Sequence, residues 1–277
     1  MPLRDWRFHT DSIGGIPAAR WSRGNGNPVL LVHGIGPGTT GLANFAPLFD
    51  RLSAQWEVHL IDLIGFGRSG RKTAPPFFDV SIWLNQIAHV VDQFQARPAA
   101  IVGNSVGGAL ALKSAVRFPA LRAVIAISAP AERYLIPAAL QNFWSVPRSA
   151  EELALALTPM TAGQTPPAPD LVASRFGAFA DPTYREYFAA MLPGTKQSQL
   201  DEAALSDAET ASLATPTLLI HGREDRAVPA EETVLPLSRR LRRADVVLLG
   251  GCGHNVLWER TADSAALIEK TLSERLG

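Results

Sequence analysis

The chemistry that this sequence can support centres on Ser105, which lies between a short apolar run and a helical stretch. Gly103 and Gly107 stand two positions to either side, and small residues at that spacing let the chain turn so tightly that the hydroxyl projects clear of the backbone. A glycine–serine–glycine pattern is common by chance. Here, however, residues 98–102 have the character of a buried strand, and residues 106–118 have helical spacing. The sequence therefore predicts a nucleophilic serine on a sharp strand-to-helix turn.

A serine nucleophile also needs a general base, and the base needs a carboxylate that orients it. After such a turn, the expected order along the chain is the acid and then the histidine. Asp225 and His254 each follow the end of an apolar run, and both come after Ser105. Glu224, beside Asp225, is a rival for the role of the acid. The candidate catalytic residues are therefore Ser105, Asp225 and His254, with Glu224 as the alternative carboxylate.

Three other reactive side chains have simpler interpretations. His33 and His221 each end an apolar run and precede a glycine, and we interpret both as scaffold residues. Cys252 lies two residues before His254 but has no turn of its own, and free cysteine is among the most buried residue types. We therefore expect Cys252 to fill space rather than act as a nucleophile.

Length and composition bound the class of protein. The chain has 277 residues, of which 47% are hydrophobic, so one large domain with an inserted subdomain is favoured over two independent domains. The formal net charge is zero and the basic residues are scattered, so the sequence lacks the basic stripe that is typical of proteins that bind nucleic acids or anionic membranes. We therefore expect a small-molecule substrate, with neither nucleic acid nor membrane as a partner.

The cysteine count and the first residues favour a cytoplasmic enzyme. A single cysteine rules out an internal disulfide, and the first ten residues carry charges where a signal peptide needs an apolar core. No apolar stretch is long enough to span a membrane. No cluster of His, Cys and carboxylate residues has the spacing of metal ligands, so we expect no metal.

Apolar runs alternate with helical stretches along most of the chain, which predicts a mostly parallel α/β sheet flanked by helices. The expected strands are 28–33, 57–63, 99–104, 122–128, 216–221 and 245–249, preceded by an antiparallel pair near 5–23. The expected helices are 44–54, 80–95, 106–118, 231–241 and 262–275. Between residues 131 and 213 the alternation fails, and helical pieces surround the Pro-rich stretch 158–169. We expect a core of residues 1–130 and 214–277, with 131–213 as a helical lid over the carboxyl ends of the strands.

The three triad segments together resemble those of the α/β-hydrolase superfamily over nearly the full length. The resemblance implies the α/β-hydrolase fold with an inserted lid, and the family's spacing after the strand favours Asp225 over Glu224. It also implies an oxyanion hole made by the backbone N–H groups of Val106, after the nucleophile, and of Ile35, with Gly34 able to share the second position.

The loop 33–45 contains a second pattern, because Gly36, Gly38 and Gly41 fit the dinucleotide signature G-x-G-x-x-G after a strand. The following helix is expected to begin too late for a phosphate to lie at its amino terminus, and the oxyanion loop already explains the glycines. We therefore expect no nucleotide and no other cofactor. Residues 62–69 likewise resemble a structural turn of the superfamily.

The same loop is similar in length, and in its terminal Asn-Phe, to that of the meta-cleavage product hydrolases. These enzymes hydrolyse a carbon–carbon bond in vinylogous 1,5-diketones after tautomerising a dienol carboxylate. The resemblance implies polar substrate contacts from Asn44, Asn104 and Arg175, and an arginine facing an apolar pocket suits a carboxylate. Its alternative is a solvated helix arginine. Two departures leave the substrate class open: Asn255, counted here as substrate-binding, stands where that family usually has Trp, and Ala227 stands where an aromatic residue is expected.

The leading mechanism has Asp225 orient His254, which deprotonates Ser105 or a water, with the oxyanion on the N–H groups of Ile35 and Val106. The alternative is a carboxylesterase or lactonase that uses the same residues. Haloperoxidase-like perhydrolysis shares the triad, and a ligand receptor without turnover is a minor alternative. Apolar lid helices could also mediate a homodimer.

Overall fold

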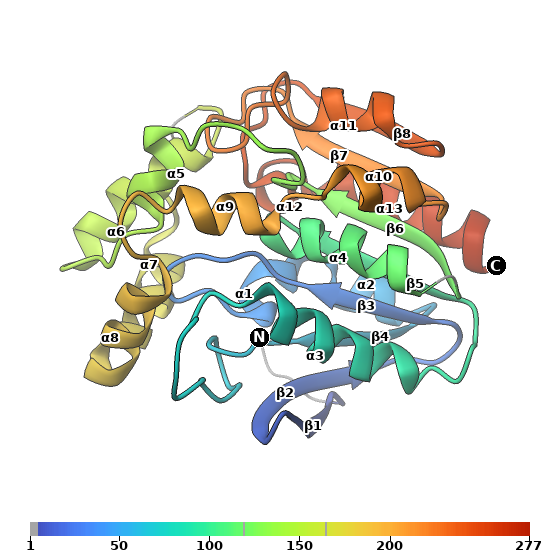
Figure 1. The fold of residues 1–277 in the computed structure, drawn as a ribbon, viewed down its shortest axis with the longest axis horizontal. Coiled ribbons are helices and arrows are strands. Elements are labelled where there is room, and N and C mark those ends of the chain that lie inside the picture. The colour runs from blue at the N-terminus through green and yellow to red at the C-terminus, as the bar shows by residue number, and fades with distance from the viewer. Residues whose placement is uncertain (1–4, 119, 164) are drawn as a thin grey trace.

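The computed structural model describes residues 5–118, 120–163 and 165–277, with the backbone alone at 47, 49 and 50. An eight-stranded sheet lies at its centre (Figure 1). The strands lie in the order β1-β2-β4-β3-β5-β6-β7-β8. Their bounds are β1 Arg7–Ile13, β2 Ile16–Arg23, β3 Pro28–Val32, β4 Glu57–Ile61, β5 Ala99–Asn104, β6 Leu121–Ile127, β7 Thr217–Gly222 and β8 Ala244–Leu249. Strands β4, β3, β5, β6, β7 and β8 are parallel, and β2 pairs antiparallel with both β1 and β4. The predicted fold class and opening antiparallel pair are confirmed.

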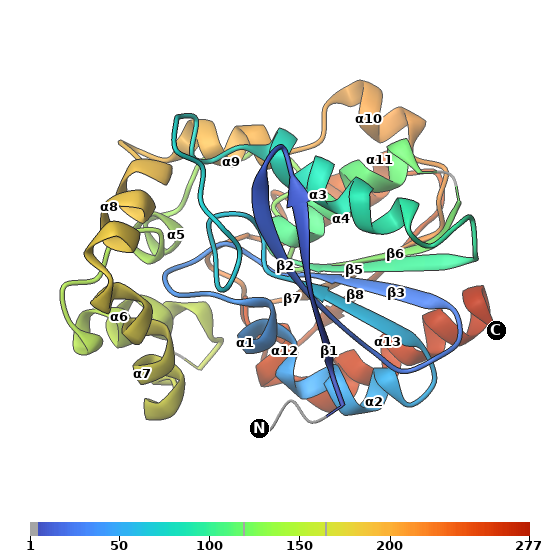
Figure 2. The ribbon, with the colours of Figure 1, turned by 90° about the horizontal axis from the view of Figure 1, so that it is seen from below.

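Helices cover both faces of the sheet (Figure 2). On one face lie α3 (Val80–Asp92), α4 (Val106–Arg117) and α11 (Val234–Arg240). The other face is covered by α1 (Gly41–Phe45), α2 (Phe49–Ser53), α12 (Val256–Glu259) and α13 (Thr261–Leu276). All five residues of β3 are buried, as expected of a parallel strand that is packed on both sides.

The connection between β6 and β7 is helical. It contains α5 (Ala138–Phe143), α6 (Ala150–Leu157), α7 (Pro169–Gly177), α8 (Pro182–Met191), α9 (Gln197–Ala203) and α10 (Asp207–Ser212). Helices α5 to α8 gather beyond one end of the sheet, on the left of Figure 1, whereas α10 lies against α4 and α11. Residue 164, in the Pro-rich stretch, and residues 1–4, in the segment that bears on localisation, lie outside the described residues. The boundaries of the lid at 131 and 213 stay a prediction.

One predicted helix, 44–54, is wrong in its extent. The structure has α1, a 3-10 turn at Ala46–Leu48, and then α2. Proline 47 has no backbone N–H to donate, which prevents a continuous α-helix. The first helix also begins earlier than expected, because the Oγ1 of Thr40 accepts from the N–H of Ala43 at 3.0 Å and caps the helix at Gly41.

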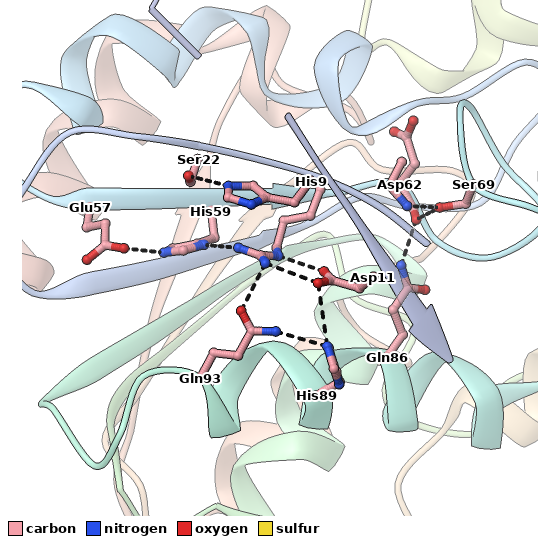
Figure 3. A network of polar contacts seen from close by, with 12 residues as sticks. His9, Asp11, Ser22, Glu57, His59, Asp62, Ser69, Gln86, His89 and Gln93 are labelled. Carbon is pink, nitrogen blue, oxygen red and sulfur yellow. Dashed lines mark hydrogen bonds and ion pairs between the residues drawn. The ribbon is translucent and has the colours of Figure 1, made fainter. Parts of the chain in front are cut away.

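A buried polar network joins the edge strands to α3, and Figure 3 shows several of its members. Arg20, on β2, is 5% exposed and donates from Nε to Asp11 Oδ2 at 2.8 Å. Its other nitrogens lie 3.1 Å from His59 Nδ1 and 2.9 Å from Gln93 Oε1. This network connects three strands and one helix at the edge of the sheet that is far from β8.

None of the helices in the described ranges is long and apolar enough to cross a membrane.

Candidate active site

Ser105 lies at the junction of β5 and α4, in a backbone conformation of φ 54° and ψ −127° that L-residues rarely adopt. The flanking glycines are required sterically. A Cβ on Gly103 would lie 2.1 Å from the carbonyl oxygen of Gly107, and a Cβ on Gly107 would lie 2.2 Å from that of Val32. The structure therefore forms the strained turn that the spacing predicts.

The loops after β7 and β8 bring the other two candidate residues to this serine. His254 Nε2 lies 3.1 Å from Ser105 Oγ, and His254 Nδ1 lies 2.8 Å from Asp225 Oδ2. All three residues are buried. This geometry allows Nδ1–H to donate to the carboxylate while Nε2 accepts from the hydroxyl, which is the arrangement of an acyl-transfer triad. Glu224 is not part of it, since its Oε2 accepts from the backbone N–H of Cys252 at 3.1 Å.

The carboxylate of Asp225 is held by its own loop. Its Oδ1 accepts from the N–H groups of Ala227 and Val228, both at 2.9 Å. Burial alone would raise the pKa of Asp225, but the His254 and His221 imidazoles outweigh it and hold the pKa well below its usual range. Asp225 is therefore ionised and able to stabilise a protonated His254.

His221 has a role that the sequence did not reveal. Its Nε2 lies 3.3 Å from Asp225 Oδ2 and 2.7 Å from the carbonyl oxygen of Val228. The acid is thus bracketed by two histidines, His221 and His254. Tyr134, also unnoticed in the sequence, donates its hydroxyl to the carbonyl oxygen of Ala227 at 2.9 Å. In the sequence, the contact between His221 and Asp225 was signalled only by their i,i+4 spacing.

The loop after β3 passes directly over Ser105. A Cβ on Gly34 would lie 2.8 Å from the Cβ of Ser105, so a larger residue would displace the nucleophile. Ile35 and Val106, whose N–H groups are the predicted oxyanion donors, are both buried, and Trp144 fixes the loop by donating Nε1–H to the carbonyl of Ile35 at 2.9 Å. The structure brings both predicted donors into the neighbourhood of Ser105.

His33 lies beneath this loop with both ring nitrogens engaged. Its Nδ1 is 2.7 Å from the carbonyl oxygen of Gly34, and its Nε2 accepts from the N–H of Leu63 at 2.9 Å. Burial lowers the pKa of His33 to about 4. The imidazole is therefore neutral near pH 7 and holds two loops together.

Two asparagines form a polar wall beside the nucleophile. Asn44 Oδ1 accepts from the N–H of Gly34 at 3.1 Å and from Asn104 Nδ2 at 2.8 Å. Asn104 Oδ1 is buried without a hydrogen-bond partner in the part of the chain that the structure describes. This oxygen can accept a hydrogen bond from a bound molecule.

Arg175 lies on α7 and is 6% exposed. Its Nε has no hydrogen-bond partner, and none of the described carboxylates forms an ion pair with it. Burial lowers the pKa of Arg175 to about 10, so it remains charged near pH 7. The helix abuts the loop after β3, because a Cβ on Gly38 would lie 2.0 Å from the carbonyl oxygen of Arg175. Arg175 is therefore a buried cation on a helix that abuts the loop after β3, not a solvated helix residue.

A cavity of about 540 Å³ reaches Arg175 and Asn255. The Pro-rich stretch and α12 form much of its wall. The other lining residues are Leu157, Thr161, Gly163, Thr165, Pro166, Pro167, Ala168, Leu171, Gly251, Trp258 and Glu259. The cavity combines apolar surface with the Arg175 cation and the Glu259 carboxylate, and its lining residues neighbour His254 in sequence without including the triad.

The dinucleotide pattern needs one correction. The helix begins at Gly41 and not several residues later, so a late helix is no argument against a phosphate. The N–H of Gly41 instead donates to Asp62 Oδ1 at 2.7 Å, and that of Ala43 donates to Thr40. Asp62 Oδ2 also accepts from the N–H of Arg68 at 2.8 Å, which makes residues 62–69 a structural turn. Two of the N–H groups that a phosphate would use at this helix are thus already bonded within the protein.

No group of three or more His, Cys, Asp or Glu side chains within the described ranges is placed to hold a metal ion.

Known proteins are similar to this chain in both amino-acid sequence and fold. Residues 27–261 match the family model of the alpha/beta hydrolase fold. The chain is 31% identical to the 2-hydroxy-6-oxo-2,4-heptadienoate hydrolase of Pseudomonas putida strain F1, over 94% of each protein. It is 32% identical to the 2-hydroxymuconate semialdehyde hydrolase of Pseudomonas sp. strain CF600, over 94% of this chain and 92% of that protein. The structure of a meta-cleavage product hydrolase from Pseudomonas fluorescens IP01 matches with a TM-score of 0.89 and 29% identity, over 96% and 97% of the two chains.

Proposed function

Because the chain belongs to the α/β-hydrolase fold family and is related to the meta-cleavage product hydrolases, we propose that it hydrolyses a carbon–carbon bond in a 2-hydroxy-6-oxo-dienoate. The observation that carries this proposal is the buried side chain of Arg175, whose Nε has no hydrogen-bond partner among the described residues and whose helix abuts the loop after β3. A buried cation without a counter-ion is costly unless a ligand supplies the negative charge. A planar dienoate carboxylate fits the two-pronged geometry of a guanidinium.

In the proposed reaction, the dienol first tautomerises to its keto form: the proton of the 2-hydroxyl group moves to C5, which becomes tetrahedral and lies next to an enone. His254 then takes the proton of Ser105 as the oxygen adds to the carbonyl carbon C6. The N–H groups of Ile35 and Val106 stabilise the resulting oxyanion. When the oxyanion collapses, the C5–C6 bond breaks and its electron pair passes into the conjugated chain, while the proton on His254 is transferred to the departing fragment. Water, deprotonated by His254, then hydrolyses the acyl–Ser105 ester and releases the carboxylic acid. Asp225 stabilises the protonated His254 in both halves of the cycle.

The anionic end of the substrate is assigned to Arg175, with Asn104 and Asn44 holding the polar groups next to it. This orientation places the electron-accepting dienoate on the side of the lid and the scissile carbonyl over Ser105. Asn255 borders the same cavity as Arg175. Its amide adds a polar group where the related hydrolases usually carry a tryptophan ring, so we expect tolerance of larger or more polar groups at this end.

Turnover of matched substrates tests the proposal. We expect the wild type to hydrolyse 2-hydroxy-6-oxo-2,4-heptadienoate and Ser105→Ala to lose roughly 10⁴-fold or more in kcat. Methylating the substrate carboxylate removes the charge for Arg175 without altering the protein. The methyl ester of the dienoate is therefore expected to react far more slowly than the free acid.

The control substrate is p-nitrophenyl acetate, which needs the triad but carries no carboxylate. Turnover of this ester with an inert dienoate would make the protein a carboxylesterase or lactonase. An acyl adduct on a residue other than Ser105, detected by mass spectrometry of a quenched reaction, would contradict both mechanisms.

We propose that the protein acts in the cytoplasm on a small-molecule substrate, which cell fractionation tests. A homodimer formed through the lid helices stays a prediction, tested by sedimentation equilibrium.

A further inference from the structure

The loop that carries His254 is attached to the lid on the carboxyl side of the histidine. The N–H of Asn255 donates to the carbonyl oxygen of Met160 at 3.2 Å. Met160 belongs to residues 158–162, which we call the strap and which follow α6 at the start of the Pro-rich stretch. The residue that follows the catalytic base is thus bonded directly to the strap.

A single carboxylate makes the attachment on the amino side. Glu259, at the end of α12, accepts from the N–H of Gly253 at Oε1, at 3.0 Å. Its Oε2 accepts from the N–H of Ala162, in the strap, at 2.8 Å. Both are charge-assisted bonds to an ionised acceptor. The residues on either side of His254 are therefore both tied to the strap, one of them through Glu259.

Steric contact reinforces these bonds. A Cβ on Gly253 would lie 2.7 Å from the backbone nitrogen of Ala162, so the strap packs directly on the loop. On the opposite side, a Cβ on Gly222 would lie 2.0 Å from the carbonyl oxygen of Gly253. The loop is enclosed between β7 and the strap, and a shift of the strap must be transmitted to it.

We infer that Glu259 is a positioning residue that couples the lid to the general base, holding the strap and the His254 loop as one unit. Thr161 of the strap, Glu259 and Arg175 all line the same cavity. A ligand anion on Arg175 therefore binds a lid whose strap sets the position of His254. This inference rests on the assignment of His254 as the base, which is part of the proposed function.

Glu224 provides a matched control. It anchors the same loop, through the N–H of Cys252, but from the core, and its other oxygen bonds the exposed Arg223. A glutamine at 224 can keep its carbonyl on Cys252 while it removes one charge, and its amide nitrogen then faces Arg223, which is exposed and can turn to solvent. A glutamine at 259 has only one acceptor for two N–H groups, so its amide nitrogen faces a donor. The two substitutions differ in the link to the lid, not in the charge removed.

The experiment compares Glu259→Gln, Glu259→Ala and Glu224→Gln by kinetics and hydrogen exchange. We expect both Glu259 variants to lose roughly 10- to 100-fold in kcat for p-nitrophenyl acetate and for the dienoate, because small displacements of a base cost rate. The KM for p-nitrophenyl acetate should change little, since that ester does not use Arg175. Amide exchange should rise together in residues 158–163 and 250–256. Glu224→Gln should resemble the wild type.

Assays well below the melting temperature of each variant separate positioning from stability. An unchanged kcat in Glu259→Ala would overturn the inference, as would an equal loss in Glu224→Gln. Exchange that rises in the strap alone would also contradict it. If the dienoate proves inert while ester turnover shows the expected pattern, the proposed carbon–carbon hydrolysis fails and the role of Glu259 stands.

Discussion

Two arginines of this protein are buried to nearly the same degree, yet their surroundings are opposite. Arg20 is 5% exposed and Arg175 is 6% exposed. Arg20 contacts both oxygens of Asp11 as well as His59 and Gln93. Arg175 has neither a carboxylate nor a partner for its Nε among the described residues.

The difference separates a structural cation from a binding cation. The cost of burying a charge can be offset by acceptors that the fold provides, as at Arg20, or by a ligand that arrives later. In the second case the protein keeps an unsatisfied group at the place where the ligand must bind. The unpaired arginine is therefore the better guide to function, although it contributes less to the fold.

The sharpest test of this contrast is the removal of Arg20. Arg20→Met leaves the Asp11 carboxylate largely buried without its cation, so the free energy of unfolding should fall by roughly 3–5 kcal/mol. Urea denaturation measures this loss, and kcat for the folded fraction should be retained. As a control, replacing both partners in Arg20→Met/Asp11→Leu should recover much of the stability. If Arg20→Met alone were as stable as the wild type, the network around Arg20 would not be what stabilises this edge of the sheet.

Arg175 should give the converse result. Arg175→Met is expected to lower kcat/KM for the dienoate, since the substrate carboxylate loses its partner. The decrease should correspond to a loss of roughly 2–4 kcal/mol in transition-state stabilisation. The free energy of unfolding should stay constant or rise, because an uncompensated buried charge has been removed. Arg175→Lys is the matched control, because it keeps the charge without the two-pronged geometry. Its kcat/KM for the dienoate should lie between those of the wild type and Arg175→Met. Equal losses for the dienoate and for p-nitrophenyl acetate would refute the assignment to the carboxylate.

Local patterns were sufficient for the strands of the core and for the three candidate catalytic residues. Strands β3 to β8 are mostly apolar runs, and Ser105 stands between two glycines that the turn requires, so both signals lie within a few residues. Asp225 and His254 follow strand ends, and parallel strands bring those ends to one edge of the sheet. This topology explains why residues separated by more than a hundred positions could be predicted to meet.

The sequence could not distinguish the two arginines. The partners of Arg20 come from β1, from β4 and from the residue that follows α3, and they meet only through the antiparallel register that pairs Arg20 with Ile61 and Ser22 with His59. The contacts of Glu259 and His221 were missed for a related reason, since each depends on loop conformation rather than on spacing. Whether a buried charge is satisfied is a property of the assembled fold.

The smallest expected effect is on the pH dependence of stability, and it tests the network around Arg20 rather than the surroundings of Arg175. Arg20 donates to His59 Nδ1, which must therefore be unprotonated, and His59 Nε2 lies 2.8 Å from Glu57 Oε1. Burial lowers the pKa of His59 to about 4 in the folded protein, against 6.5 for the ordinary side chain. Between these values the unfolded chain binds more protons than the folded one, so stability is greatest above pH 6.5 and falls as the pH approaches 4.

His33 contributes a pH dependence of the same sign, because burial lowers its pKa to a similar value. The part due to His59 is isolated by His59→Asn, whose Oδ1 can accept from Arg20 without titrating. We expect this variant to lose less stability than the wild type between pH 6.5 and 4, because Asn takes up no proton on unfolding. Urea denaturation across this range measures the slope. Parallel slopes would contradict this prediction. They would mean that His59 does not contribute to the pH dependence, which would then arise at other buried groups such as His33.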